Sequence, residues 1–244
     1  MLSKTICLFD VDGTLTKPRL VIEQDMYETL TKLKEKVTIG LVGGSDLNKI
    51  AENPKEEVLN SFEFVFTENG LTTYIKGKMV NCESILLRLG EETCQELINF
   101  CLSYMSELKL PCKRGHFIEF RNGMINISPI GRSCSLQERR EFFEYDKKHK
   151  IRETFAKVLT QRFSEKYNLK FSIGGQISID VFPIGWDKTY CLKFLDNFDK
   201  IYFFGDRTNE GGNDYEIYSH AATNAYNVED PKDTISYLKS IFDI

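Results

Sequence analysis

The run ICLFDVDGTLT, residues 6–16, constrains the fold more than any other part of the chain. It opens with consecutive apolar residues, which predict a short buried strand over residues 5–11. Asp10 and Asp12 then stand one residue apart, and Gly13 follows them. In an open parallel sheet, ligands bind beyond the carboxyl ends of the strands. The strand therefore directs both acids toward one site.

The segments around this strand have the pattern of an α/β domain. A buried strand is expected over 37–43 and another over 62–70, with a helix over 23–36, and this alternation implies parallel βαβ units. A hairpin is expected over 71–80, with Lys76 and Gly77 at its turn. The α/β pattern returns after Trp186, where we expect helices over 187–197, 214–221 and 230–242 and a buried strand over 200–206.

The pattern between these two parts is different. A helix over 91–108, a hairpin about Asn122-Gly123, a helix over 144–167 and a hairpin over 169–183 predict an α+β unit on an antiparallel sheet. The predicted fold is thus α/β, with a Rossmann-like parallel-sheet core and an inserted α+β cap. We expect the core to comprise residues 1–81 and 187–244 and the cap to comprise residues 82–186.

Composition excludes several classes of protein. The net charge of −4 gives no general attraction to nucleic acid or to an anionic membrane, so neither partner is expected. None of the seven cysteines forms a C-x-x-C pair, which argues against a zinc site or a disulfide framework. The apolar run at the start is too short for a signal peptide, and no stretch approaches the roughly 20 apolar residues of a membrane span. A cytoplasmic location is expected.

The polar residues after the strands predict a magnesium and phosphate site. Asp10, the backbone carbonyl of Asp12, and Asp206 would offer Mg²⁺ hard oxygen ligands. A calcium loop is the competing motif, and it fails because Gly13 stands at its fourth position and a strand precedes it. Phosphate oxygens would be held by Gly44, Ser45 and Lys188. A carboxylate beside Mg²⁺ and a held phosphoryl group is the arrangement for an aspartyl-phosphate intermediate.

The predicted cap carries a basic segment. Between Lys113 and Arg140 there are six cations and two acids, a local charge of +4 in an acidic chain. Arginine suits forked binding of phosphate oxygens, whereas the alternative is that these are solvated surface charges. If the arginines grip a second phosphate, the cap is expected to act as a lid that excludes water. A sugar hydroxyl could then compete with water for the phosphoryl group, which favours a mutase over a phosphatase.

The motif DVDGT, with Ser45, Lys188 and Asp206, resembles the haloacid dehalogenase superfamily of phosphotransferases. That resemblance implies that Asp10 is the nucleophile and Asp12 the general acid and base. The stretches KRGHFIEFRNGMINISPIGRSCS, FSIGGQISIDVFPIGWDKTYCL and IYFFGDRTNEGGND are more specific and resemble the eukaryotic phosphomannomutases over nearly the whole chain. This resemblance implies Mg²⁺, a hexose 1,6-bisphosphate activator and a homodimer formed through the cap.

The same resemblance assigns further residues. It implies substrate contacts at Arg19, Arg121, Arg132, Arg139, Ser178 and Asp180, and a second ion site at Tyr218, His220 and Thr223. His220 replaces a usual aspartate there, so the second site holds only if backbone carbonyls are the ligands. Glu210 stands where the family usually has proline, which is expected to loosen that loop. Asp214 is expected to be a partner of Lys188 rather than a metal ligand.

The expected function is interconversion of mannose 6-phosphate and mannose 1-phosphate. The enzyme would supply GDP-mannose synthesis, and so belong to mannose metabolism and protein glycosylation. The runner-up is a hexose-phosphate phosphatase of the same superfamily, and the non-enzyme alternative is a phosphosugar-binding protein. The preference between mannose and glucose phosphates, a bisphosphatase side activity and the dimer surface are not determined by the sequence.

Overall fold

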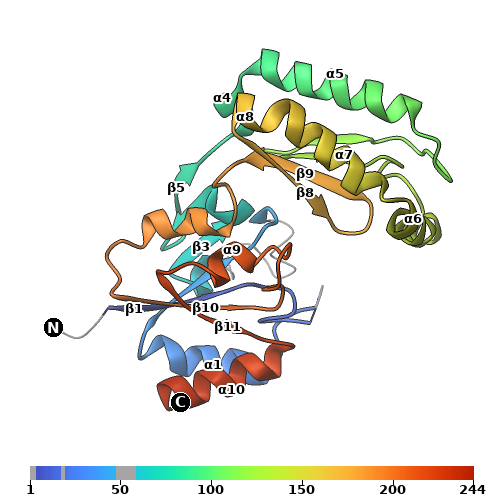
Figure 1. Ribbon diagram of the computed structural model, residues 1–244. Coiled ribbons are helices and arrows are strands. Elements are labelled where there is room, and N and C mark those ends of the chain that lie inside the picture. The colour runs from blue at the N-terminus through green and yellow to red at the C-terminus, as the bar shows by residue number, and fades with distance from the viewer. Residues whose placement is uncertain (1–3, 18–19, 48–58) are drawn as a thin grey trace. The chain divides into compact units, whose positions relative to one another are not determined.

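The computed structural model describes residues 4–17, 20–47 and 59–244, which form two compact units (Figure 1). The first unit comprises Met1–Cys82 and Gly185–Ile244, and the second comprises Glu83–Ile184. The second unit is therefore an insertion between two halves of the first.

The first unit contains a seven-stranded sheet in the order β11-β10-β1-β2-β3-β4-β5. The strand β1 lies between β10 and β2 and is parallel to both, while β4 and β5 extend the sheet in antiparallel fashion. The central strands of this α/β sheet are therefore parallel, as predicted. Its strands are β1 (Thr5–Phe9), β2 (Thr38–Val42), β3 (Phe64–Thr67), β4 (Thr72–Ile75), β5 (Lys78–Cys82), β10 (Lys200–Gly205) and β11 (Thr223–Asn227).

Both faces of this sheet are covered, which explains the consecutive apolar residues of β1. Cys7 and Phe9 belong to the core on the face of α1 (Gln24–Lys34) and α10 (Pro231–Phe242). Ile6 and Leu8 point the other way into a second core, because side chains alternate along a strand. The 3₁₀ helix η3 (Lys188–Phe194) and the short helix α9 (Tyr215–Tyr218) supply partners on that face. Each fully buried Leu, Ile or Phe stabilises the unit by about 1.5–3 kcal/mol.

The second unit is built on a four-stranded antiparallel sheet in the order β6-β7-β9-β8. Helices cover one face of it: Figure 1 shows α7 lying over β8 and β9, and the ring of Tyr104 in α5 stacks on that of Phe155 in α7. Ile125, Ile179 and Val181 are fully buried in this unit. The elements are α4 (Ile85–Leu89), α5 (Glu91–Glu107), β6 (Ile118–Phe120), β7 (Ile125–Ile127), α6 (Leu136–His149), α7 (Ile151–Leu159), the π-helical turn η2 (Thr160–Ser164), α8 (Glu165–Tyr167), β8 (Leu169–Gly174) and β9 (Ser178–Pro183).

The single helix predicted over 144–167 is wrong. The chain forms α6 and α7 with a break at Lys150, whose φ of 55° is left-handed. Helix α6 begins earlier than predicted because Ser135 and Glu138 form a capping box. The Asp146 carboxylate accepts a hydrogen bond from the Arg152 backbone N–H (2.8 Å), which stabilises the break.

The helix expected over 187–197 is present at Lys188–Phe194, where it is of the 3₁₀ type. Two further elements were not predicted. The strand β11 was not predicted, because TNAYN lies at the sheet edge and lacks an apolar run. The short helix α4 was also missed, since five residues are too few to show a helical period.

Candidate active site

Asp10 is fixed at the carboxyl end of β1 by the backbone around it. Its N–H donates to the carbonyl of Phe204 in β10 (3.0 Å), and the loop after it turns tightly, with the Gly13 N–H donating to the Thr16 carbonyl (2.7 Å). Gly13 has a φ of 83°, and a Cβ there would lie 2.6 Å from Oδ2 of Asp206. The glycine of the motif is therefore required for the close approach of two acid-bearing segments.

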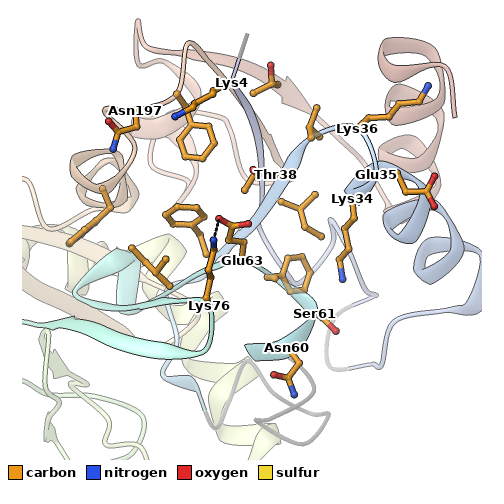
Figure 2. A pocket seen from close by; sticks show the side chains of 18 of the residues that line it. Lys4, Lys34, Glu35, Lys36, Thr38, Asn60, Ser61, Glu63, Lys76 and Asn197 are labelled. Carbon is orange, nitrogen blue, oxygen red and sulfur yellow. Dashed lines mark ion pairs between the residues drawn. The ribbon is translucent and has the colours of Figure 1, made fainter. Parts of the chain in front are cut away.

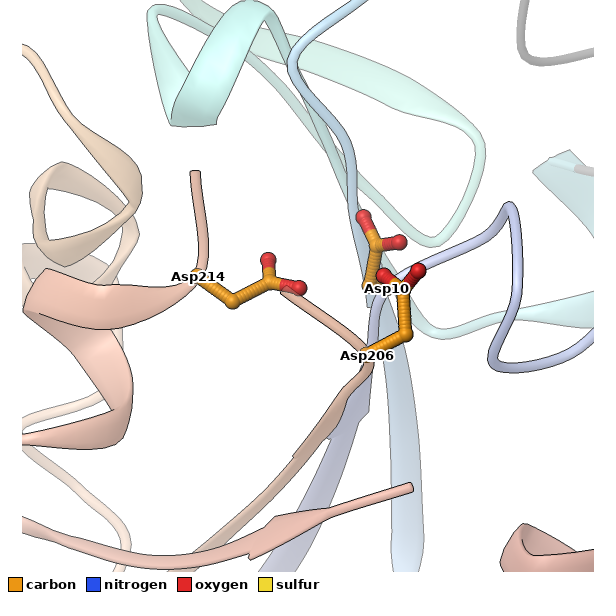
Figure 3. Close-up of side chains that lie close together, drawn as sticks. All are labelled: Asp10, Asp206 and Asp214. Atoms are coloured by element: carbon orange, nitrogen blue, oxygen red, sulfur yellow. The ribbon is translucent and has the colours of Figure 1, made fainter. Parts of the chain in front are cut away.

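Two more acids lie beside Asp10 (Figure 3). Asp206 follows β10, and Asp214 immediately precedes α9. Each of the three offers a carboxylate oxygen within 4.8 Å of the other two. Because β1 and β10 are neighbouring parallel strands, their carboxyl ends meet at one edge of the sheet.

Lys188 supplies the cation of this cluster. It opens η3 after Asp187, whose side chain accepts the Thr189 N–H (3.0 Å) and caps the turn. The Lys188 side chain is fully buried, and its Nζ contacts Oδ1 of Asp10 and, at 2.5 Å, Oδ1 of Asp214. The expected pairing of Asp214 with Lys188 is confirmed.

Burial dominates the electrostatics of the cluster. Desolvation raises the pKa of Asp10 from 3.8 to about 7, against the opposing effect of Lys188, and repulsion from Asp214 and Asp206 adds to the rise. Burial also raises the pKa of Asp206, and the Asp214 charge acts in the same direction. Burial alone would lower the pKa of Lys188, but Asp10 and Asp214 more than offset it and hold that pKa above its ordinary value. Lys188 is therefore a fixed positive charge among three acids.

The donor set fits a hard cation. Both oxygens of Asp214 are engaged, Oδ1 by Lys188 and Oδ2 by the Arg207 backbone N–H (3.0 Å). Oδ1 of Asp206, in contrast, is buried and has no hydrogen-bond partner in the described part of the chain. A buried carboxylate oxygen without a partner is costly, and a bound Mg²⁺ would satisfy it. Asp10 and Asp206 are therefore better candidate ligands than Asp214.

The remaining predicted residues of this edge belong to two loops. Asp12 is exposed, and its backbone bridges to Thr16. Gly44 and Ser45 follow β2, where the Ser45 carbonyl accepts the Glu68 N–H (3.0 Å). Since β2 is parallel to β1, this loop lies at the same sheet edge as Asp10.

The second unit brings other predicted residues onto one sheet face. Asn126 pairs with Asp180, and Asp180 with Ser172, so these side chains share the face opposite the helices. Ser178 lies on the same face two residues before Asp180, as predicted, and its hydroxyl donates to the Gly174 carbonyl (2.9 Å). The Asn126 amide donates to Oδ1 of Asp180 (2.5 Å). Burial raises the pKa of Asp180, while this hydrogen bond, Arg121 and Arg132 oppose the rise.

The arginines of the second unit are held differently from one another. Arg121 and Arg132 both contact Glu119, and Arg132 also donates to Oδ1 of Asn126 (2.7 Å). Arg139 lies in the first turn of α6, and its buried Nε has no hydrogen-bond partner among the described residues. Arg19 lies outside the described residues.

Sequence reasoning missed Glu119 and Asn126 as members of this polar face. The available signal was the two-residue period of the hairpin about Asn122-Gly123, which places Glu119 and Arg121 on one face. The strand register then sets Glu119 opposite Asn126. That register could not be read from composition.

The residues named for a second ion site lie at the end of α9 and the start of β11. Tyr218 ends the helix, the Thr223 N–H donates to the His220 carbonyl (3.0 Å), and the Thr223 hydroxyl donates to the Ile217 carbonyl (2.7 Å). Nδ1 of His220 accepts the Ala222 N–H (3.2 Å). The carbonyl and Nδ1 of His220 therefore already accept hydrogen bonds within this turn.

A groove of about 1020 Å³ lies at the other end of the same sheet (Figure 2). Thr5, Thr38 and Phe64, which begin three parallel strands, line it. Of its lysines, Lys76 pairs with Glu63 (3.5 Å) and Lys36 donates to the Phe242 carbonyl (2.6 Å). The groove is thus separate from the acidic cluster.

Among the described helices, none combines the length and apolarity needed to span a membrane.

Solved structures at low sequence identity show which fold this chain shares. A Streptococcus mutans protein matches with a TM-score of 0.69 at 15% identity, covering 99% of this chain and 100% of that one. A haloacid dehalogenase-like hydrolase from Bacteroides thetaiotaomicron matches with a TM-score of 0.61 at 13% identity, covering 98% and 100%. A trehalose-6-phosphate phosphatase from Aspergillus fumigatus gives 0.62 at 15% identity, covering 99% and 94%. The fold is that of the haloacid dehalogenase-like proteins.

Sequence comparison narrows the class to a family. The family described as eukaryotic phosphomannomutase matches residues 26–244. A phosphomannomutase of Glycine max is 54% identical over 237 residues, covering 97% of this chain and 96% of that protein. A phosphomannomutase of Schizosaccharomyces pombe is also 54% identical, over 246 residues, covering 99% and 95%. The chain belongs to the eukaryotic phosphomannomutase family and is an enzyme of this type.

Proposed function

We propose that this chain interconverts mannose 6-phosphate and mannose 1-phosphate through an aspartyl-phosphate enzyme and a hexose 1,6-bisphosphate intermediate. The observation that carries the proposal is the Asp10 cluster in a chain that matches this family over nearly its whole length. The first unit is proposed to be the catalytic core and the second the substrate-binding cap.

The first half-reaction would load Asp10. A carboxylate oxygen of Asp10 attacks the phosphorus of the bisphosphate, and the bond from phosphorus to the sugar oxygen breaks. Asp12, as a carboxylic acid, gives its proton to that leaving oxygen. Lys188, held between Asp10 and Asp214, keeps its positive charge beside the phosphoryl oxygens. Gly44 and Ser45 are proposed to bind the same phosphoryl group.

The second half-reaction reverses the roles. The Asp12 carboxylate takes the proton of a sugar hydroxyl, whose oxygen attacks the phosphorus as the bond to Asp10 breaks. The phosphate that is not transferred is proposed to be held by Arg19, Arg121, Arg132 and Arg139, and the sugar hydroxyls by Ser178 and Asp180. A Mg²⁺ ion bound by Asp10, the Asp12 carbonyl and Asp206 would supply positive charge to the reacting phosphoryl group.

Further assignments rest on the family alone. We infer a bisphosphate activator, a cytoplasmic reaction that supplies GDP-mannose, and a homodimer formed through the second unit. A second ion at Tyr218, His220 and Thr223 is part of the same inference.

The test is a coupled assay on mannose 1-phosphate, with and without added glucose 1,6-bisphosphate. The expected result is formation of mannose 6-phosphate that depends on the bisphosphate. Release of inorganic phosphate without isomerisation would instead identify a hexose-phosphate phosphatase and overturn the proposal. Binding of mannose 1-phosphate with no turnover would indicate a binding protein.

A further inference from the structure

A carboxylate stands among the arginines of the second unit. Glu119 lies in the middle of β6, and its Oε2 accepts hydrogen bonds from Nε (3.0 Å) and Nη2 (2.5 Å) of Arg121. The same oxygen lies 2.9 Å from Nε of Arg132. One acidic oxygen therefore engages both guanidinium groups.

The backbone fixes this arrangement. Glu119 pairs with Asn126, and Asn126 with Asp180, so the three side chains form a row across β6, β7 and β9. Arg132 reaches the row from a turn in which Gly131 has a φ of 84° and packs against the backbone of Gly115. A side chain at residue 131 would overlap that backbone, so the position of Arg132 is well defined.

The contacts to Glu119 are nevertheless easy to exchange. A carboxylate oxygen has two lone pairs, yet Oε2 of Glu119 faces three N–H donors. The side chains of Glu119, Arg121 and Arg132 remain 29%, 26% and 29% exposed, so water and an anion can reach them. A phosphate group offers several strong acceptor oxygens to the same guanidinium groups. Binding of a phosphate there competes directly with Glu119.

We propose that Glu119 is a positioning residue that weakens the grip of Arg121 and Arg132 on a phosphate group, so that the bound sugar phosphate can be released. This inference rests on the proposed mutase function. In that reaction the bisphosphate must leave the arginines and return with its ends exchanged, and too tight a grip would slow that exchange. When the phosphate departs, Glu119 can pair with Arg121 and Arg132 again. This lowers the free-energy cost of releasing the phosphate.

The variant Glu119→Gln removes the competing charge and keeps the shape of the side chain. Two partly exposed ion pairs are lost from the ligand-free protein, so the dissociation constant for inorganic phosphate should fall roughly threefold to tenfold. The KM for mannose 1-phosphate should fall with it. The kcat should also fall, because release becomes slower. A merely structural role would raise the dissociation constant and KM instead.

Two control variants distinguish the effect of the Glu119 charge from an effect on folding. Glu119→Asp keeps the negative charge and should retain most of the wild-type affinity and kcat. Glu153→Gln removes one negative charge from α7, where Glu153 pairs with Lys157 (2.8 Å), and should change neither constant. Circular dichroism and thermal melting of each variant verify that the fold is intact.

Calorimetric titration with inorganic phosphate needs no turnover, so it tests Glu119 apart from the mutase reaction. If the wild type isomerises mannose 1-phosphate but Glu119→Gln binds phosphate no more tightly, the role of Glu119 is overturned. If the wild type does not isomerise its substrate, the proposed function fails, and the role of Glu119 in release fails with it. Tighter phosphate binding with lower KM and kcat supports the inference.

Discussion

The charged residues proposed for chemistry in the first unit and for binding in the second are held in different ways. In the first unit, Asp10, Lys188 and Asp214 are 6%, 0% and 0% exposed and are tied to strand ends and loops. In the second unit, Arg121 and Arg132 are about a quarter exposed and contact other side chains on a sheet face. A reacting carboxylate must stay in place, whereas groups that bind and release a ligand must be able to exchange partners. This difference agrees with the proposed function, in which the first unit carries the chemistry and the second unit binds the substrate.

The largest expected effect is at Asp10, the buried acid at the carboxyl end of β1. Asp10→Asn removes the proposed nucleophile and should lower kcat by about 10⁴-fold or more. The coupled mannose 1-phosphate assay measures this loss, with a melting curve to verify the fold. A variant that kept a tenth of the wild-type rate would remove Asp10 from the mechanism.

Arg152 tests whether burial, rather than the unit, determines how a charge behaves. Its side chain is 4% exposed, binds Asp146 (2.7 Å) and donates to the Gly175 carbonyl (3.0 Å) in the turn before Ser178. Arg152→Met leaves Asp146 buried without its cation and should cost about 3–5 kcal/mol in the free energy of unfolding.

The control for Arg152 is Arg121→Met, which breaks a partly exposed pair in the same unit. It should cost about 1 kcal/mol or less in stability. Urea denaturation measures both variants. Equal losses in the free energy of unfolding would show that the partly exposed pair contributes as much to stability as the buried pair.

Asp206 tests the proposed Mg²⁺ site of the first unit, because its Oδ1 has no hydrogen-bond partner among the described residues. Asp206→Asn should weaken apparent Mg²⁺ affinity by roughly 10- to 100-fold, by analogy with the losses seen when groups supporting a metal ligand are changed. A Mg²⁺ titration of activity measures the shift, and the rise in melting temperature on adding Mg²⁺ should shrink as well. An unchanged Mg²⁺ requirement would assign the ion to other ligands.

A further expected effect is a pH dependence of stability in metal-free protein. Because the pKa of Asp10 rises from 3.8 to about 7, the folded state binds a proton that the unfolded state has lost between these values. Stability from this group therefore falls as pH rises from about 3.8 to about 7 and is constant above that range. Relative to Asp10→Asn, wild-type protein in EDTA should lose a few degrees of melting temperature between pH 5.5 and pH 8. A wild-type melting temperature that does not fall relative to that of Asp10→Asn over this pH range would contradict the raised pKa.

Part of the site could be predicted because its residues carry local signals. Asp10, Asp12 and Gly13 follow an apolar strand, and the steric need for Gly13 is visible as its approach to Asp206. The pairing of Lys188 with Asp214 was also expected. The role of Glu119 was not expected. The turn at Asn122-Gly123 sets Glu119 opposite Asn126, but the contact with Arg132 comes from a turn outside this hairpin.

The helices of the second unit also show that local signals can be read from the sequence, whereas contacts with distant residues cannot. The start of α6 is signalled by Ser135 and Glu138, which form a local capping box. The break after it depends on Asp146 accepting the Arg152 N–H while Arg152 reaches the turn between β8 and β9. The first of these contacts is local, but the second joins α7 to a turn 23 residues further along the chain, which no short window of sequence contains.

By itself, the sequence determined the parallel core strands, the inserted antiparallel unit and the acids at the ends of β1 and β10. These follow from hydrophobic periods and turn residues, which act over a few residues of chain. Only the tertiary structure decided that Lys188 also contacts Asp10, that Asp206 has a buried oxygen without a hydrogen-bond partner among the described residues, and that Glu119 contacts both Arg121 and Arg132. Each of these depends on the packing of segments distant in sequence, where burial and the charges of neighbours set the strength of every contact.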